Sequence, residues 1–178
     1  MGKRSLVAAV VLAIAAVGMP AIASSASAAK CPPKSLGGKT LGWIEVDDVR
    51  VPIKKAKYPK GGTLNPPASN KVVGLSARHQ GLKSERGTSV FAWHVRYGPG
   101  CPGTLNPILD LKPGDTFDVV AKNGDRQTFE LQEKDKVKRG KYKAEWFRLA
   151  GPRQVTLFTC ADRRAGNSVT PRSLSQPQ

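Results

Sequence analysis

The stretch Thr-Leu-Phe-Thr-Cys at positions 156–160 decides how this chain is interpreted. It is an apolar, β-branched segment, typical of a buried strand, and it ends in Cys160. An earlier segment of the same kind, residues 88–94, ends in His94, and Arg172 comes after the cysteine. A thiol, an imidazole and a guanidinium at strand ends can be assembled into an acyl-transfer site. The sequence therefore predicts a catalytic site made of these three side chains.

Each of the three residue types has a role in such a site. A cysteine attacks a carbonyl as its thiolate, and the pKa of a free thiol is near ~8.5, so a neighbouring cation raises the reactive fraction. His94 would protonate the leaving amine and deprotonate the incoming one, while Arg172 would stabilise the oxyanion. Taken singly, each has an ordinary structural explanation, such as an inert buried cysteine. His79, in a polar loop, is the competing histidine.

The N-terminal residues have the pattern of an export signal. Lys3 and Arg4 form a positive region, residues 6–19 are apolar, and Ala-Ser-Ala at 26–28 is a suitable cleavage site. The apolar run is short of the roughly 20 residues of a membrane-spanning helix. We expect residues 1–28 to be a cleaved signal peptide, with a retained anchor as the alternative. Either way the protein is expected outside the cytoplasm, extracellular or at the cell surface.

The chain beyond the signal is long enough for one domain with a single core. We divide it into an N-terminal segment, residues 29–41, and one domain, residues 42–178. Residues 29–178 hold 27 basic and 13 acidic residues. The positive electrostatic field of such a domain favours binding to anionic lipid or anionic wall polymers. No recognised nucleic-acid motif accompanies the charge, so nucleic acid is not an expected partner. Two histidines and scattered acids make no metal site, and no glycine motif cradles phosphate, so no cofactor is expected.

The three cysteines all lie beyond the expected signal peptide. In an oxidising compartment two cysteines tend to pair and leave one thiol. Cys31 and Cys101 lie in loops rich in proline and glycine, whereas Cys160 lies in an expected strand. The sequence therefore predicts a Cys31–Cys101 disulfide and a free Cys160.

Short strands separated by Gly, Pro and Asn dominate the pattern, which favours a closed or partly closed β-barrel. The Asn123-Gly124 pair predicts a hairpin with a type I′ turn. A short helix is expected within residues 104–111, a long loop over 57–70 and a basic loop over 134–143. The expected strands are residues 41–46, 49–53, 71–75, 88–94, 116–121, 126–131 and 154–160.

The order and spacing of these motifs resemble the sortase transpeptidases, whose signature is Thr-Leu-X-Thr-Cys. Residues 62–67 and 72–74 resemble the segment before the histidine strand in classes E and F. Residues 87–95 resemble the family's Gly-X-X-Val-X-X-Gly-His-Val, and residues 109–115 resemble its Leu-X-X-Leu-X-X-Gly-Asp. The resemblance covers residues 42–174 and is greatest to class F, then to class E.

This resemblance implies an all-β fold, a closed eight-stranded sortase-type barrel with one or two short helices. It also implies a cysteine transpeptidase that cleaves a Leu-Pro-X-Thr-Gly-like sorting signal on a secreted protein. The acyl group would be held as a thioester on Cys160 and passed to an amine of a peptidoglycan precursor or a pilin lysine.

Two positions depart from the family pattern. Trp93 stands where the family usually has glycine, and its bulk would either narrow the site or pack beside it. The chain after Arg172 is short and polar where the family has a hydrophobic strand, so Arg163 or Arg164 is an alternative source of the guanidinium.

Two other functions compete with the transpeptidase. One is a catalytically weak or silent sortase-like domain that binds anionic wall polymer or a partner protein, favoured by the charge, the short last strand and Trp93. The other is an L,D-transpeptidase, which is disfavoured because its Ser-His-Gly-Cys type of motif is absent. If the chain is a sortase, the loops over residues 57–70 and 134–148 are expected to select the sorting signal.

Overall fold

The computed structural model describes residue 31 and residues 38–57, 64–98, 100–138, 141–162 and 167–175. For residues 138, 160–162 and 167–175 it describes the backbone alone. The expected signal peptide, residues 1–28, lies outside the described residues.

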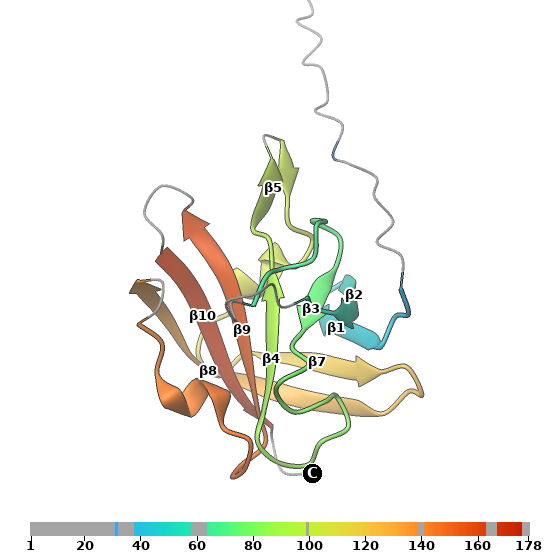
Figure 1. Cartoon of the computed structure of the whole chain (residues 1–178), viewed down its shortest axis with the longest axis vertical. Helices are drawn as coiled ribbons and strands as arrows, with labels where there is room; N and C mark the ends of the chain where they lie inside the picture. Colours follow the sequence, from blue (N-terminus) through green and yellow to red (C-terminus); the bar gives the residue numbers. More distant parts are fainter. Residues whose placement is uncertain are drawn as a thin grey trace, which may run out of the picture.

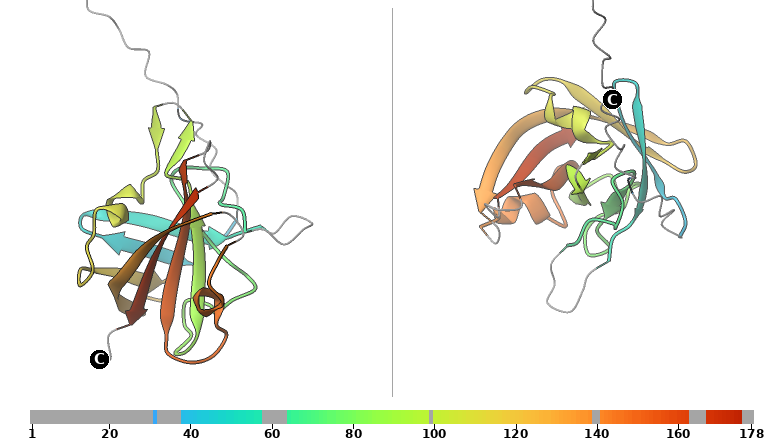
Figure 2. Two further views of the ribbon diagram at one scale, coloured as in Figure 1. Left: turned by 90° about the vertical axis from the view of Figure 1, so that its left-hand side faces the viewer. Right: turned by 90° about the horizontal axis from the view of Figure 1, so that it is seen from above.

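Eight strands close into a barrel in the order β1-β2-β3-β4-β9-β10-β8-β7, as Figures 1 and 2 show. The predicted fold class, an all-β closed barrel of eight strands, is confirmed. The strands are β1 (Gly42–Val46), β2 (Val49–Lys55), β3 (Val73–Leu75), β4 (Thr88–Trp93), β7 (Thr116–Ala121), β8 (Arg126–Lys138), β9 (Gln154–Asp162) and β10 (Asn167–Ser175).

Four short elements lie outside the barrel wall in the part of the chain that is described. Two strands form a separate two-stranded sheet, and two 3₁₀ helices lie in connections between barrel strands. The first helix confirms the short helix expected within residues 104–111. The four elements are β5 (Arg96–Gly98), β6 (Cys101–Pro102), η1 (Asn106–Leu109) and η2 (Ala144–Phe147).

The core fills the barrel interior. In β1 the buried and half-buried residues alternate, as they do in a strand with one face on a core. β4 is buried along its whole length, and η2 packs against it. The largest side chains that are fully buried in the core cluster include Ile44, Ile53, Phe91, Phe129 and Leu157.

The structure corrects three sequence-based expectations. The turn at Asn123-Gly124 is not type I′, because only Gly124 has a positive φ, of 97°. The Gly124 amide donates to the Ala121 carbonyl at 2.9 Å, and the Ala121 amide to the Asp125 carbonyl at 2.8 Å. This is a three-residue loop with a left-handed glycine, the next most common hairpin connection.

The other two corrections concern strand lengths. Residues 134–138, expected in a basic loop, continue β8, because β10 pairs with them along their whole length. The expected strand over residues 71–75 begins only at Val73. Of the loop expected over residues 57–70, Lys57 and Asn65 form an isolated β-bridge, and residues 58–63 lie outside the described residues. Within the described ranges, no helix has the length and apolar character to cross a membrane.

Candidate active site

The predicted nucleophile and base lie on neighbouring parallel strands. The ladder between β4 and β9 pairs residues that are 66 positions apart, and it ends at Trp93 and Thr159. His94 and Cys160 are the next residue of each strand segment. Adjacent strands are ~4.8 Å apart, so the two backbones meet at one end of the barrel wall. The Thr159 hydroxyl donates to the Trp93 carbonyl at 3.1 Å and ties this end together. We call it the rim.

His94 directly follows β4 and is half-buried. Its ring contacts Tyr97 edge-on, with 5.3 Å between the ring centroids and 80° between the planes. The carbonyl of His94 lies so close to Gly103 that a Cβ at that position would be 1.9 Å from the oxygen. Only glycine fits position 103, so the backbone just after the β4 ladder is fixed by a close approach.

Trp93, the departure from the family pattern, points away from the site. Its side chain is 1% exposed and belongs to the core cluster inside the barrel. Its indole Nε1 is buried and has no hydrogen-bond partner in the structure as described. Of the two interpretations of this residue, packing beside the site is therefore the one that the structure supports.

Arg172 is not brought next to Cys160 at the level of the backbone. Cys160 pairs with Ser168 of β10, whereas Arg172 pairs with Thr156. Ser168 and Arg172 are four positions apart on β10, which corresponds to roughly 13 Å along the strand. The guanidinium role of Arg172 stays a prediction.

The alternative arginines, Arg163 and Arg164, lie outside the described residues. The strand that carries Arg172 is nevertheless longer than its polar sequence indicated. β10 runs on to Ser175, and it pairs with both β8 and β9.

His79, the competing histidine, lies away from the rim. It belongs to the connection before β4, where the Gln80 amide bonds the carbonyl of Thr88, the first residue of β4. The Nδ1 of His79 is 2.6 Å from the Ser76 hydroxyl oxygen, and its ring is 5.4 Å from that of Phe147. Burial lowers the pKa of His79, and the nearby charge of Arg78 acts in the same direction. The structure thus gives His79 a packing role and leaves His94 as the histidine beside Cys160.

An aromatic cluster beside β9 was missed by the sequence analysis. Phe158, two residues before Cys160, stacks on Phe147 of η2 with 5.4 Å between centroids and 8° between planes. Tyr142 and Trp146 contact Phe158 edge-on at 5.3 and 6.0 Å. The sequence did carry a signal for it, because the segment 142–147, Tyr-Lys-Ala-Glu-Trp-Phe, holds three aromatic residues within the loop over 134–148 that was expected to select the sorting signal.

Part of the positive charge near the aromatic cluster is balanced within the protein. Lys143 Nζ lies 2.7 Å from Asp135 Oδ2 and 3.8 Å from Glu133 Oε2. The hydrogen bond to Asp135 raises the pKa of Lys143, with the charge of Glu133 contributing less. Lys134 donates to the Leu109 carbonyl at 2.6 Å. Two of the lysines in the basic segment are thus engaged in intramolecular contacts.

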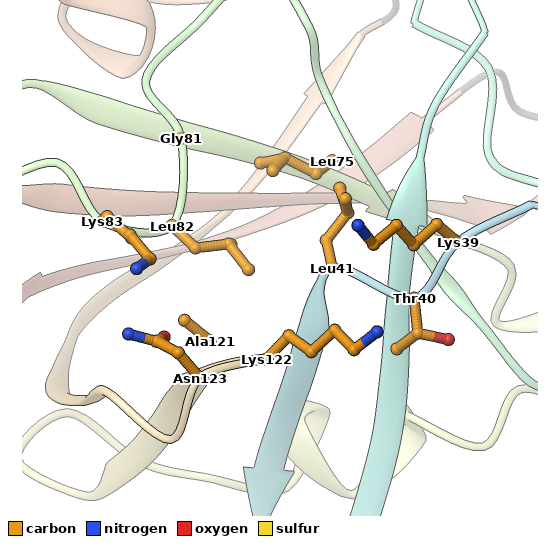
Figure 3. Close-up of a pocket in the computed structure, with 10 residues that line it drawn as sticks. All are labelled: Lys39, Thr40, Leu41, Leu75, Gly81, Leu82, Lys83, Ala121, Lys122 and Asn123. Atoms are coloured by element: carbon orange, nitrogen blue, oxygen red, sulfur yellow. The ribbon is translucent and has the colours of Figure 1, made fainter.

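A shallow pocket of about 710 Å³ is lined by residues 39–41, 75, 81–83 and 121–123 (Figure 3). Leu41, Leu75 and Leu82 supply apolar side chains to it, and lysines surround them. Because the pocket adjoins the loop that precedes β4, it is separate from the rim. In the described ranges no group of three or more His, Cys, Asp or Glu residues could hold a metal ion.

The chain is similar to several solved structures, although no family model and no curated protein matches it. Sortase C of Clostridium perfringens SM101 is 19% identical with a TM-score of 0.60, over 79% of this chain and 72% of that one. Sortase C1 of Streptococcus suis is 17% identical with a TM-score of 0.63, over 79% and 74%. Sortase A of Corynebacterium diphtheriae, a lid mutant, is 14% identical with a TM-score of 0.62, over 82% and 75%.

These comparisons establish that the chain has the sortase fold. The neighbours are sortases C and A, so the greater likeness to classes F and E stays a prediction from the sequence motifs. Identities below 20% define the fold alone, and a fold does not fix an activity.

Proposed function

We propose that this protein is an exported cysteine transpeptidase of the sortase type. Residues 1–28 direct export, and residues 42–178 form the catalytic domain at the cell surface or outside the cell. The observation that supports the proposal is the register of β4 and β9, which ends at the pair Trp93 and Thr159, directly before His94 and Cys160. The sortase fold supports it, because that fold is shared with enzymes named as sortases C and A.

In the first half of the reaction, the Cys160 thiolate attacks the threonine carbonyl of a Leu-Pro-X-Thr-Gly-like signal. The peptide bond after threonine breaks, and His94 gives its proton to the glycine amine that leaves. The acyl group remains on sulfur as a thioester. A guanidinium, from Arg172 or a neighbouring arginine, stabilises the oxyanion.

In the second half, a primary amine attacks the thioester and His94 takes up its proton. The new amide is released and Cys160 returns as a thiolate. The acceptor is the amine of a peptidoglycan precursor or a pilin lysine. One structural neighbour, sortase C of Streptococcus pneumoniae, is described in terms of catalysis and pilin substrate specificity.

The aromatic cluster of Tyr142, Phe147 and Phe158 supports a role for residues 134–148 in selecting the signal. Phe158 lies on the strand that leads to Cys160, the other two rings contact or stack on it, and Tyr142 is 37% exposed. Aromatic side chains supply large apolar contacts for an extended peptide.

Mass spectrometry with a Leu-Pro-X-Thr-Gly peptide tests the proposal. We expect an adduct of the Leu-Pro-X-Thr fragment on Cys160, and its conversion to an amide when a glycine-based amine is added. Cys160→Ala should abolish adduct and product while the unfolding temperature stays the same. Undiminished turnover by that variant would exclude Cys160 as the nucleophile.

The second candidate is a silent sortase-like domain that binds anionic wall polymer or a partner protein. It is favoured by the register of β10, which leaves Arg172 four residues from the partner of Cys160. It predicts salt-sensitive binding to a teichoic-acid-like polymer and no reaction of Cys160 with a thiol-directed substrate mimic. Rapid labelling of Cys160 at neutral pH excludes it.

A further inference from the structure

A small hairpin leaves the barrel directly after His94. Its strands, β5 and β6, form a sheet separate from the barrel, and it projects beyond the end of β4 (Figures 1 and 2). A lone two-stranded hairpin is marginally stable in water. Contacts outside its own ladder must therefore hold it in place.

The hairpin is tethered at its far strand by a disulfide. Cys101 of β6 is bonded to Cys31, as the sequence predicted, and is 3% exposed. The bond links the hairpin to the N-terminal segment, 70 residues away in the chain. Where the hairpin joins the barrel, the Val95 carbonyl accepts two hydrogen bonds, from the Gly103 amide at 2.7 Å and from Asn106 Nδ2 at 3.0 Å.

A third anchor comes from the connection before β3. The Asn70 side-chain amide donates to the carbonyl of Pro102 in β6 at 2.7 Å. The Asn70 backbone carbonyl accepts from the Thr104 amide at 2.8 Å. The hairpin is thus fixed through β6 and through the residues that flank its two strands, although it is not part of the barrel ladder.

The residue that the hairpin presents to the rim is Tyr97. It lies in β5, and its ring meets the His94 imidazole edge-on at 5.3 Å. Such a contact restricts the plane of the imidazole as well as its position. A general base has to lie within hydrogen-bond reach of the proton it moves, so the orientation of this ring decides whether it can act on Cys160 and the substrate.

We propose that the disulfide-tethered β5–β6 hairpin positions His94, with Tyr97 as the positioning residue. The inference rests on the proposed function, in which His94 is the acid and base. It adds a role for the Cys31–Cys101 disulfide: the bond holds the hairpin so that Tyr97 keeps the imidazole turned toward Cys160. Cys31 and Cys101 then act on the reaction indirectly, by holding the hairpin, while Cys160 acts directly as the nucleophile.

The first test compares Tyr97→Ala with Tyr97→Phe. We expect the alanine variant to lose about tenfold in kcat with KM changed by less than about twofold, because misplacing a catalytic group slows the reaction without removing substrate contacts. The phenylalanine variant keeps the ring contact and should stay within about threefold of the parent protein. Arg96→Lys, on the same strand, is the matched control and should have no effect. Equal kcat values for the parent and Tyr97→Ala would overturn the proposal.

The pH dependence of Cys160 alkylation by iodoacetamide separates positioning from a general loss of structure. Tyr97→Ala should shift the apparent pKa of the alkylation profile, and Tyr97→Phe should restore it. His94→Ala is the reference in both assays. If His94→Ala changes neither turnover nor the profile, the proposed function fails. If His94→Ala changes both and Tyr97→Ala changes neither, only the positioning role fails.

The disulfide is tested by the double variant Cys31→Ser/Cys101→Ser. Its kcat should fall by about threefold to tenfold, and adding Tyr97→Ala to it should have a smaller effect than in the parent, because both changes act through His94. Fully additive losses, or an unchanged kcat in the folded double variant, would contradict the role of the disulfide. If the double variant does not fold at the assay temperature, the comparison of Tyr97→Ala with Tyr97→Phe alone tests the positioning role.

Discussion

The two ends of the β4–β9 pair are built in different ways. At the start of the two strands, which we call the base, a buried charged side chain ties several segments together. At the rim, where the ladder ends, His94 is followed by a hairpin that lies outside the barrel sheet. The base is held by a dense polar network, whereas the rim depends on a few tethers.

Arg153 is the centre of the base. It is 6% exposed and donates to Gln127 Oε1 at 3.1 Å, to Ser89 Oγ at 2.9 Å, and to the carbonyls of Gly87 and Gly81 at 3.5 and 3.4 Å. Its guanidinium also lies 5.5 Å from the centroid of the Phe129 ring. Burial lowers the pKa of Arg153 to about 10, so the side chain is still charged at neutral pH. The hydrogen bonds offset the cost of burying that charge.

The contrast indicates that the two ends of the β4–β9 pair have different roles, one in stability and one in activity. The base fixes the register between β4 and β9, and the same register carries His94 and Cys160 to neighbouring positions at the rim. The fine orientation at the rim is then left to local contacts such as Tyr97 against His94. Changes at the base should therefore alter stability, and changes at the rim should alter activity.

Removing the imidazole is the largest expected effect. His94→Ala should lower kcat/KM by about 10³-fold, within the range for loss of a general acid and base. Its unfolding temperature should stay within about 2 °C of the parent, because His94 is half-buried and outside the core cluster. His79→Gln is the matched control and should keep kcat/KM within about twofold. A rate unaffected by His94→Ala would break the assignment of the rim as the active site.

The second largest effect is expected from removing the buried charge of Arg153. Arg153→Met should lower the free energy of unfolding by about 3 kcal/mol, since it leaves polar partners buried without a donor. Turnover per folded molecule should be unchanged. Arg148→Met changes an arginine near the same loops that is not buried, and it should cost less than about 0.5 kcal/mol. Urea denaturation of the three proteins measures the difference, and equal losses for both variants would mean that Arg153 does not organise the base.

That the strand segments before His94 and Cys160 are neighbours fits the sequence-based prediction, whereas the position of Arg172 could not be predicted. Two continuous apolar segments are typical of buried parallel strands, and each ends in a chemically active residue. Parallel neighbours of equal register then bring those residues together. The partner of Arg172, in contrast, depends on how the β9–β10 hairpin closes, and a shift in that closure moves the residue along the strand.

The packing of the aromatic cluster against β9 could not be predicted for a related reason. η2 is four residues long, and a 3₁₀ helix of that length has little preference of its own. Its position depends on Phe147 and Trp146 packing against Phe158, which is a contact between distant segments. At the turn around Gly124, by contrast, the local sequence predicted the element but not its detailed geometry. The Asn123-Gly124 pair correctly predicted a hairpin between β7 and β8. The number of residues in its loop, however, is set by the register in which the two strands pair.

The smallest expected effect concerns His79, which links the loop before β4 to η2 through Ser76 and Phe147. Because burial and Arg78 lower the pKa of His79 below 6.5, the folded state favours the neutral imidazole. The associated stability is fully present above pH 6.5 and is lost as the pH falls toward the lowered pKa, because the unfolded chain takes up the proton first.

His79→Gln should flatten this dependence, since glutamine can bond Ser76 and does not titrate. The check is the free energy of unfolding of both proteins from urea denaturation at about pH 7.5, 6.5 and 5.5, which spans the ordinary pKa of histidine. The parent should lose more stability than the variant below pH 6.5, because only the parent has a histidine at position 79. Parallel curves would show that His79 is not coupled to folding, and that the contact between the loop before β4 and η2 does not respond to pH through this residue.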